Sequence, residues 1–248
     1  MKIIVPVVAV LAYAASLTAI AIWPPLIALT LAVTWPFDKN RAAAGRLLRL
    51  CAAFVSRSFP FWRIRIEGAW PEAKGPYVVV SNHQSFLDIF LISNLPHEMK
   101  WIAKKELFRI PWIGWCFAMV GDIALERGDA ASAQKVMDKA RRYLENGMHV
   151  MIFPEGTRSR DGKMLPFKAG AFKLAVDAGV PILPLAVSGS AQGMPKGGPW
   201  VRPTNLVLRI LEPVPTDAAR AAQGRAQVQA IAKLRDGVRE RIEKALES

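Results

Sequence analysis

The chain has 248 residues, of which 52% are hydrophobic, and its 33 Lys and Arg against 20 Asp and Glu give a formal net charge of +13. This length suits one domain with an appendage. The two cysteines, Cys51 and Cys116, exclude a disulfide framework and fit a reducing compartment. The positive charge predicts an anionic partner. Because no nucleic-acid motif, zinc spacing or repeat is visible and the hydrophobic excess is N-terminal, we expect a lipid surface and no nucleic acid.

Residues 3–37 carry no charged side chain. Ile3–Ile22 is long enough for one membrane crossing of about 20 residues, and too long for the apolar core of a signal peptide. Two interpretations remain, a single span followed by an interfacial segment, or a helical hairpin that enters one leaflet and turns at Pro24-Pro25. The hairpin is favoured because basic residues flank both ends, which places both ends on the cytoplasmic side. These flanking residues are Lys2, Lys39, Arg41, Arg46 and Arg49.

Residues 41–58 predict an amphipathic helix whose apolar stripe packs on the following domain, although its arginines could also meet lipid phosphates. Trp62–Glu67 then alternates strictly between apolar and polar residues, as a half-exposed strand does.

Tyr77–Val80 predicts a buried strand, and the turn that follows it carries His83 and Asp88. Residues five apart on one helix diverge by about 140°, so the two side chains can meet only if His83 precedes the helix. With Ser85 as N-cap, Asp88 falls in the first helical turn, where its carboxylate would orient the imidazole. The alternative is that Ser85 and Asp88 form a capping box and do no more than begin the helix.

Residues 99–103 predict a strand, after which Lys104–Phe117 interleaves basic and aromatic residues. Such a segment could contact single-stranded nucleic acid, lie at a lipid headgroup boundary, or be a solvated helix with one packed face. Arg127 follows Gly121–Glu126, and its guanidinium suits bidentate phosphate binding.

Residues 130–146 predict a helix and Val150–Phe153 a buried parallel strand, with His149 at its start as a structural residue. The turn after this strand would cradle a phosphate. Gly156 permits close backbone approach, Thr157 offers a hydroxyl and Arg158 a forked cation.

Residues 167–178 predict a helix, residues 180–186 and 206–211 predict strands, and a charged helix runs from Thr216 towards the end. Strands therefore alternate with helices. This pattern predicts an α/β fold with a largely parallel sheet flanked by helices, an antiparallel edge, and a membrane-associated helical segment at the N-terminus.

Two blocks of the chain resemble the hallmarks of the glycerolipid acyltransferase family. Asn82-His83 with Asp88 matches its H-x-x-x-x-D block, and Phe153–Ser159 matches its second hallmark, in the right order and separation. The resemblance covers roughly residues 60–215 and is closest to bacterial 1-acylglycerol-3-phosphate acyltransferases. Gly121–Arg127 is similar to a third block but has Ala124 and Glu126 where Phe and Asp are common, and residues 180–186 are similar to a fourth.

We therefore expect a membrane-embedded hairpin and amphipathic helix over 1–58, and the resemblance implies a catalytic domain over 59–248. The resemblance also implies transfer of a fatty acyl group from acyl-CoA or acyl carrier protein to the sn-2 hydroxyl of 1-acyl-sn-glycerol-3-phosphate, giving phosphatidic acid. His83 would be the general base, oriented by Asp88. The residues expected to bind substrate are Asn82, Lys104, Arg127, Glu155, Gly156, Thr157 and Arg158.

A thioester is already activated, so no covalent acyl-enzyme is expected, and the sequence has no G-x-S-x-G elbow. We expect no metal and no cofactor, a monomer, and a catalytic domain on the cytoplasmic face of a bacterial inner membrane. Other acceptors remain open, either another lysophospholipid or an amine-containing lipid. Two further alternatives are a thioester hydrolase that uses the same His–Asp pair on water, and a non-catalytic lipid-binding protein.

Overall fold

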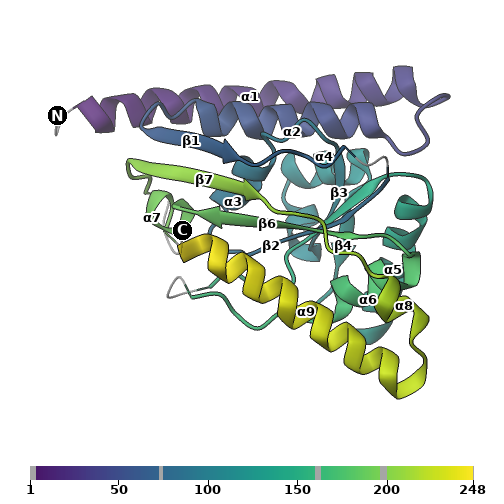
Figure 1. Cartoon of the computed structure of the whole chain (residues 1–248). Helices are drawn as coiled ribbons and strands as arrows, with labels where there is room; N and C mark the ends of the chain where they lie inside the picture. Colours follow the sequence, from purple (N-terminus) through teal and green to yellow (C-terminus); the bar gives the residue numbers. More distant parts are fainter. Residues whose placement is uncertain (1–3, 73–74, 160–162, 196–199, 248) are drawn as a thin grey trace.

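The computed structural model describes residues 4–72, 75–159, 163–195 and 200–247. Figure 1 shows a sheet between two layers of helices, with the long first helix across one face and the last helix across the other. The helices in chain order are α1 (Ile4–Thr34), α2 (Ala42–Arg57), α3 (Leu87–Ile92), the 3-10 helix η1 (Lys105–Arg109), α4 (Ile113–Val120), α5 (Ala130–Glu145), α6 (Gly170–Ala178), α7 (Ser190–Gly193), α8 (Asp217–Ala221) and α9 (Gly224–Glu247). The strands are β1 (Trp62–Glu67), β2 (Val78–Ser81), β3 (Met99–Lys104), β4 (Ile123–Leu125), β5 (His149–Ile152), β6 (Ile182–Ser188) and β7 (Thr204–Ile210).

Within the described residues, the seven strands form one sheet in the order β1-β7-β6-β2-β5-β3-β4. The neighbouring strands pair in parallel, except that β6 and β7 pair antiparallel. The prediction of an α/β fold with a largely parallel sheet is therefore confirmed. Because β2, β3, β4, β5 and β6 run the same way, their carboxyl ends meet at one edge of the sheet. Ligands of open parallel sheets bind outside this edge.

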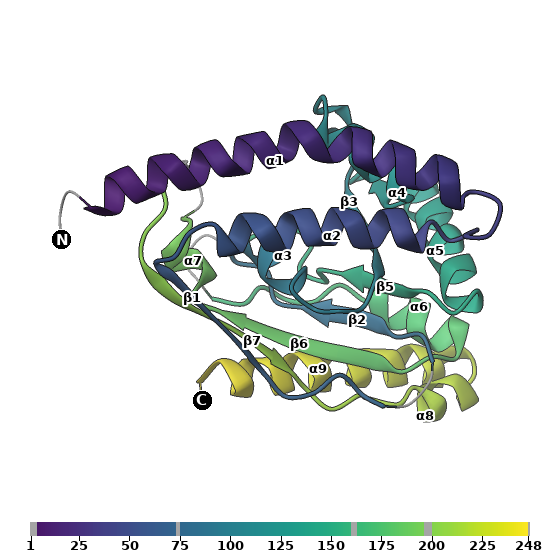
Figure 2. The same cartoon turned by 90° about the horizontal axis from the view of Figure 1, so that it is seen from above.

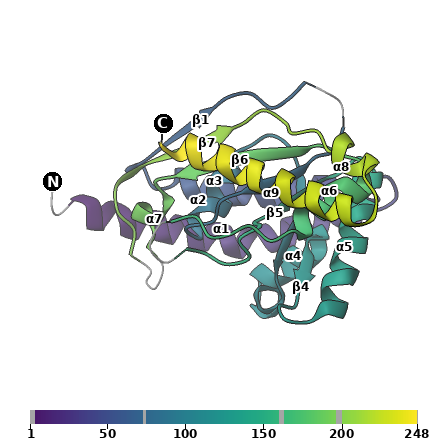
Figure 3. The same cartoon turned by 60° about the horizontal axis from the view of Figure 1, so that its bottom comes forward.

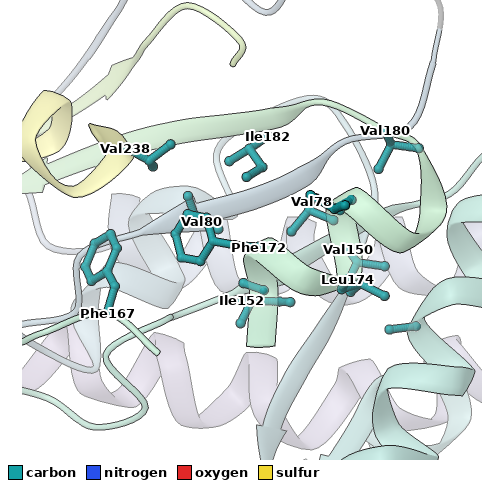
Figure 4. Packing of buried hydrophobic residues seen from close by; sticks show 14 of the residues in the cluster. Val78, Val80, Val150, Ile152, Phe167, Phe172, Leu174, Val180, Ile182 and Val238 are labelled. Atoms are coloured by element: carbon teal, nitrogen blue, oxygen red, sulfur yellow. The ribbon is translucent and has the colours of Figure 1, made fainter. Parts of the chain in front are cut away.

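Apolar side chains cover both faces of the sheet, as parallel strands require. On β2, Val78 and Val80 point into one cluster, while Val79 points into the other, and all three are fully buried. Figure 4 shows the first cluster, in which Phe172 of α6 and Val238 of α9 pack over the strands. The second cluster lies between the sheet and helices α1 to α3. Figure 3 shows α9 in front of the sheet and α1 behind it.

The expected turn at Pro24-Pro25 is wrong, because α1 continues through both prolines to Thr34. Each proline lacks the N–H that would bond one turn back, a loss that breaks many helices. Here the helix is held by contacts along its length. The Trp23 indole Nε1 donates to the Leu47 carbonyl of α2 at 2.9 Å, and Ile27 is fully buried against α4. Figure 2 shows α1 as one bowed helix that lies beside the antiparallel α2.

The chain reverses between α1 and α2 at Arg41, whose φ of 54° is a left-handed conformation. The Arg41 guanidinium donates to the carbonyls of Ala118 and Met119, so this turn is tied to α4. The expected C-terminal helix begins as predicted but is divided into α8 and α9.

Candidate active site

The predicted site residues follow the carboxyl ends of adjacent strands. His83 lies directly after β2, and Glu155 to Arg158 lie after its neighbour β5. Lys104 ends β3, and Arg127 follows β4, the next strand along. Neighbouring strands lie about 4.8 Å apart. Segments that are up to 75 residues apart in the chain therefore lie along the same carboxyl edge of the sheet.

His83 and Asp88 form a hydrogen-bonded pair, with Nδ1 2.8 Å from Oδ2. Asp88 has no exposed surface, and its Oδ2 also accepts the backbone N–H groups of Gln84 at 2.7 Å and Ser85 at 2.9 Å. A carboxylate oxygen that takes three bonds is an acceptor, so the shared proton is on His83 Nδ1. The lone pair of Nε2 is then available to a substrate.

The prediction of Ser85 as N-cap is wrong by one residue, because the N-cap of α3 is Phe86, which makes no side-chain cap hydrogen bond. Helix α3 begins at Leu87, so Asp88 still lies in its first turn, where it both accepts the Ser85 N–H and bonds the imidazole of His83. Ser85 Oγ accepts from the Leu87 N–H at 3.2 Å and donates to the Met194 carbonyl at 2.7 Å. The Ser85 hydroxyl thus has structural partners on both sides.

Glu155 holds the backbone of the turn that carries His83. Its Oε1 accepts the His83 N–H at 2.6 Å and its Oε2 accepts the Leu165 N–H at 2.9 Å. Burial raises the pKa of Glu155 to about 7, with a smaller contribution from Asp88, while the two backbone donors oppose the shift. The Ser159 N–H donates to the His83 carbonyl at 3.0 Å. Both backbone groups of His83 are therefore bound by the segment that follows β5.

Asn82 secures the other side of the turn. Its amide is fully buried, donates to the Val187 carbonyl at 2.8 Å and accepts from the Val187 N–H at 2.8 Å. The sequence predicted substrate contacts for Asn82 and Glu155. In the structure their polar atoms bond backbone groups, so both residues are better described as supports of His83.

The imidazole of His83 also stacks on Phe153, with ring centroids 4.0 Å apart and planes 15° apart. Its side chain is 14% exposed. The ring is thus fixed between an aromatic face and a carboxylate while one edge stays open. Phe153 was identified only as part of the second hallmark, and this packing role had no separate sequence signal.

The basic residues of the edge differ in exposure. Lys104 is 43% exposed and pairs with Glu106 at 3.2 Å, Arg158 is half-buried and Arg127 is exposed. Gly156 has φ of +71°, and an added Cβ would lie 3.0 Å from Lys168 Nζ. Glycine therefore allows both the turn and the close approach of a lysine, which gives the edge a further positive charge. Thr157 is exposed beside them.

Asp122, in the third block, has a structural role. It is buried and pairs with Arg49 of α2 at 2.7 Å, so Arg49 points into the protein and not towards lipid phosphates. Asp122 also accepts the Trp101 N–H at 2.9 Å. Among the described residues, no group of three or more His, Cys, Asp and Glu side chains is placed to hold a metal ion.

Comparison with known proteins gives consistent matches. A family model described as "Acyltransferase" matches residues 63–188. The 1-acyl-sn-glycerol-3-phosphate acyltransferase LPAT1 of Arabidopsis thaliana is 43% identical over 163 residues, which are 65% of this chain and 46% of that protein. The 1-acyl-sn-glycerol-3-phosphate acyltransferase alpha of Homo sapiens is 38% identical over 176 residues, 69% of this chain and 62% of that one. The chain thus spans about half the length of the plant relative.

The fold also matches a solved structure over nearly its whole length. The crystal structure of the 1-acyl-sn-glycerophosphate (LPA) acyltransferase PlsC from Thermotoga maritima aligns with a TM-score of 0.69 and 28% identity, covering 96% of each chain. The likeness therefore extends to the N-terminal helices as well as to the sheet.

Proposed function

This chain belongs to the acyltransferase family, and on that premise we propose that it transfers a fatty acyl group from an acyl thioester to the sn-2 hydroxyl of 1-acyl-sn-glycerol-3-phosphate. The observation that carries the proposal is the His83–Asp88 pair at the carboxyl edge of the sheet, where Nδ1 and Oδ2 lie 2.8 Å apart. The names of the relatives point to the same acceptor.

In the proposed step, His83 Nε2 takes the proton of the acceptor hydroxyl as its oxygen attacks the thioester carbonyl. The C–O ester bond forms, the C–S bond breaks, and the imidazolium returns its proton to the thiolate. Asp88 keeps Nδ1 protonated and stabilises the positive ring. General-base help of this kind contributes on the order of 10²–10⁴ in rate. The step needs no covalent acyl-enzyme, metal or cofactor.

The base assignment is tested with His83→Ala and Asp88→Asn. Each should lower kcat at least tenfold, since less would fall below the usual range for general-base removal. Both variants should keep the wild-type membrane association. Thioester loss is followed with and without acceptor lipid. Equal loss without acceptor would identify a hydrolase instead, and vesicle binding with no thioester consumption at all would identify a lipid-binding protein.

The acceptor is proposed to place its phosphate among Lys104, Arg127 and Arg158, with the Gly156 backbone and the Thr157 hydroxyl beside it. A phosphate monoester offers three terminal oxygens to forked donors, whereas phosphocholine has less charge and more bulk. Arg158→Ala should raise KM for lysophosphatidate by about 30-fold, equivalent to about 2 kcal/mol for a lost charged hydrogen bond. The measurement compares lysophosphatidate with lysophosphatidylcholine, and equal losses on both would contradict the phosphate site.

We propose that α1 attaches the catalytic domain to the cytoplasmic face of the inner membrane. It is the one helix in the described residues that is long and apolar enough to cross a bilayer, over Val7–Thr34. The donor would then arrive from the cytoplasm as acyl-CoA or acyl carrier protein, and the enzyme would act as a monomer.

A further inference from the structure

The turn between η1 and α4 exposes large apolar side chains away from the sheet. Trp112 is 45% exposed, Trp115 is 53% exposed and Ile110 is 41% exposed. The two indole rings pack on each other with centroids 4.7 Å apart. We call Ile110, Trp112 and Trp115 the Trp knuckle. Exposed tryptophans that share a patch mark an interaction site more often than scattered apolar residues do.

The backbone of the knuckle is a tight turn that is fixed by hydrogen bonds. Trp112 has φ of 66° and ψ of −64°, a conformation that a bulky residue rarely adopts. Hydrogen bonds from Ile113 N–H to the Pro111 carbonyl and from Gly114 N–H to the Ile110 carbonyl, both 2.8 Å, close the turn. A Cβ at Gly114 would lie 2.2 Å from the Phe108 carbonyl oxygen. The backbone is thus fixed in a strained form that displays the rings.

The knuckle lies next to α1, which also exposes apolar side chains. Helix α4 packs on α1 through Cys116 and Val120 against Ile27. Figure 2 shows the segment from β3 to α4 projecting on the same side of the molecule as α1. Helix α1 itself carries exposed apolar residues such as Leu29, which is 62% exposed.

Positive charges flank the knuckle. Arg109 is exposed at the end of η1, and Lys104 is exposed at its start. Tryptophan rings prefer the boundary between hydrocarbon and headgroups, and basic residues beside them meet lipid phosphates. This combination fits a lipid surface better than a protein partner, whose contact would not call for proximity to α1.

We propose that the Trp knuckle docks in the headgroup layer of the same leaflet that receives α1, as a second contact with the membrane. The inference rests on the membrane association proposed above. Because η1 follows directly after Lys104, this contact would fix the height and tilt of the carboxyl edge relative to the lipid acceptor. If α1 were the only contact, the domain could rotate about the axis of this helix. A second contact removes that freedom and defines one orientation.

Depth measurements on the full chain test this directly. Single cysteines replace Trp115, Leu29 on α1 and Val228 on α9, which is 68% exposed in the layer on the other side of the sheet. The native Cys51 and Cys116 are buried, which raises the pKa of Cys51 to about 12 and that of Cys116 to about 11, so both thiols label poorly. An environment-sensitive fluorophore on each cysteine is quenched by lipids that carry nitroxides near the headgroup, in vesicles with anionic phospholipid.

The proposal expects strong quenching at positions 115 and 29 and none at 228. Quenching at 29 alone would overturn the knuckle contact while leaving α1 in lipid. Quenching at none of the three would remove the membrane association itself, and with it this inference, without bearing on acyl transfer.

One variant removes the indole ring without destabilising the protein. In Trp112→Gly, the strained turn holds glycine, the residue that best tolerates positive φ. The thermal midpoint of this variant should therefore equal or exceed that of the wild type. Combined with Trp115→Ala, it should lower turnover on acceptor embedded in vesicles several-fold and leave turnover on a short-chain, water-soluble acceptor unchanged. Equal turnover in vesicles would contradict the proposal. So would self-association in detergent that the double variant abolishes, since the knuckle would then be a contact between copies.

Discussion

At the scale of single residues, Asp88 concentrates its interactions on one oxygen. Oδ2 accepts three hydrogen bonds, while the equally buried Oδ1 has no hydrogen-bond partner among the described residues. An asparagine can direct its carbonyl oxygen at the same three donors, so Asp88→Asn keeps the turn and the His83 tautomer. The charge that stabilises the imidazolium is what it removes. This is why the asparagine variant separates chemistry from folding more cleanly than alanine.

Glu155→Gln is expected to lower kcat by roughly tenfold or more, with little change in KM. Both carboxylate oxygens accept backbone N–H groups, so an amide would turn its NH₂ towards either His83 or Leu165. A buried donor facing a donor costs about 1–3 kcal/mol, and relief of that cost would move His83. Glu145→Gln, on the exposed surface of α5, is the matched control. A rise in KM at unchanged kcat would instead return Glu155 to the role of a substrate ligand.

The same variant should also change how the free energy of unfolding depends on pH. Because burial raises the pKa of Glu155 from 4.5 to about 7, the folded protein holds this proton over a range where the unfolded chain has lost it. The contribution of Glu155 to the free energy of unfolding is therefore fully present below about pH 4.5 and is lost as pH rises to about 7. The slope is about 1.4 kcal/mol per pH unit. The free energy of unfolding is measured against pH for the wild type and for Glu155→Gln. The difference between the two proteins should change between about pH 4.5 and pH 7. A difference that stays constant over this range would contradict the raised pKa.

Whether a contact of the site could be predicted from the sequence depends on how far apart along the chain the two interacting groups lie. The His83–Asp88 contact was predicted because it is local, since the two residues are only five positions apart at a turn between a strand and a helix. The partner of Asn82 lies 105 positions away, that of Glu155 lies 72 positions away, and both are backbone groups. Backbone N–H and C=O groups are the same in almost every residue, so the residue type does not reveal which of them a side chain bonds. No pattern in the sequence could therefore have shown that these two side chains support the turn.

At the scale of elements, strand periodicity predicted the sheet well, whereas the course of α1 depended on tertiary contacts. The prolines at 24 and 25 disfavour a helix locally, but packing on α2 and α4 outweighs them. Likewise, the sequence left open that the arginines of α2 meet lipid phosphates, but Arg49 is buried within the protein. It pairs with Asp122 at 2.7 Å and lies 3.7 Å from Glu98.

Asp122→Asn is expected to destabilise the fold by about 3–5 kcal/mol, because it leaves the Arg49 charge buried and less well paired. The double variant Arg49→Met with Asp122→Asn removes that charge and keeps an acceptor for the Trp101 N–H, so it should be more stable than the single variant. Asp177→Asn breaks an exposed pair with Lys173 and should cost less than about 1 kcal/mol. Chemical denaturation measures all three, and a double variant no more stable than the single one would rule out the buried charge as the cause.

At the scale of the whole molecule, the position of α1 decides how the candidate active site would meet a lipid substrate. The helix packs on the domain at several points between Tyr13 and Ile27. Tyr13 contacts Phe59 with centroids 5.3 Å apart, Trp23 bonds Leu47, and Ile27 is buried against α4. A helix of 31 residues is about 46 Å long, more than the roughly 30 Å hydrocarbon core. If it crossed the bilayer upright, these contacts would draw α2 and its arginines into the hydrocarbon.

We therefore expect α1 to lie along one leaflet, with both of its ends on the cytoplasmic side. Cysteines replace Val7 near its start and Phe37 in the turn that follows it, where the side chains are 55% and 87% exposed. An impermeant thiol reagent should label neither in intact cells and should label Phe37→Cys in inverted membrane vesicles. Val7→Cys should react only from that same side, if it emerges from the lipid at all. Labelling of Val7→Cys from outside intact cells would show that α1 crosses the membrane. The packing of α1 on α2 would then have to open when the protein inserts, because a spanning helix cannot keep Tyr13 against Phe59 while the catalytic edge stays in water.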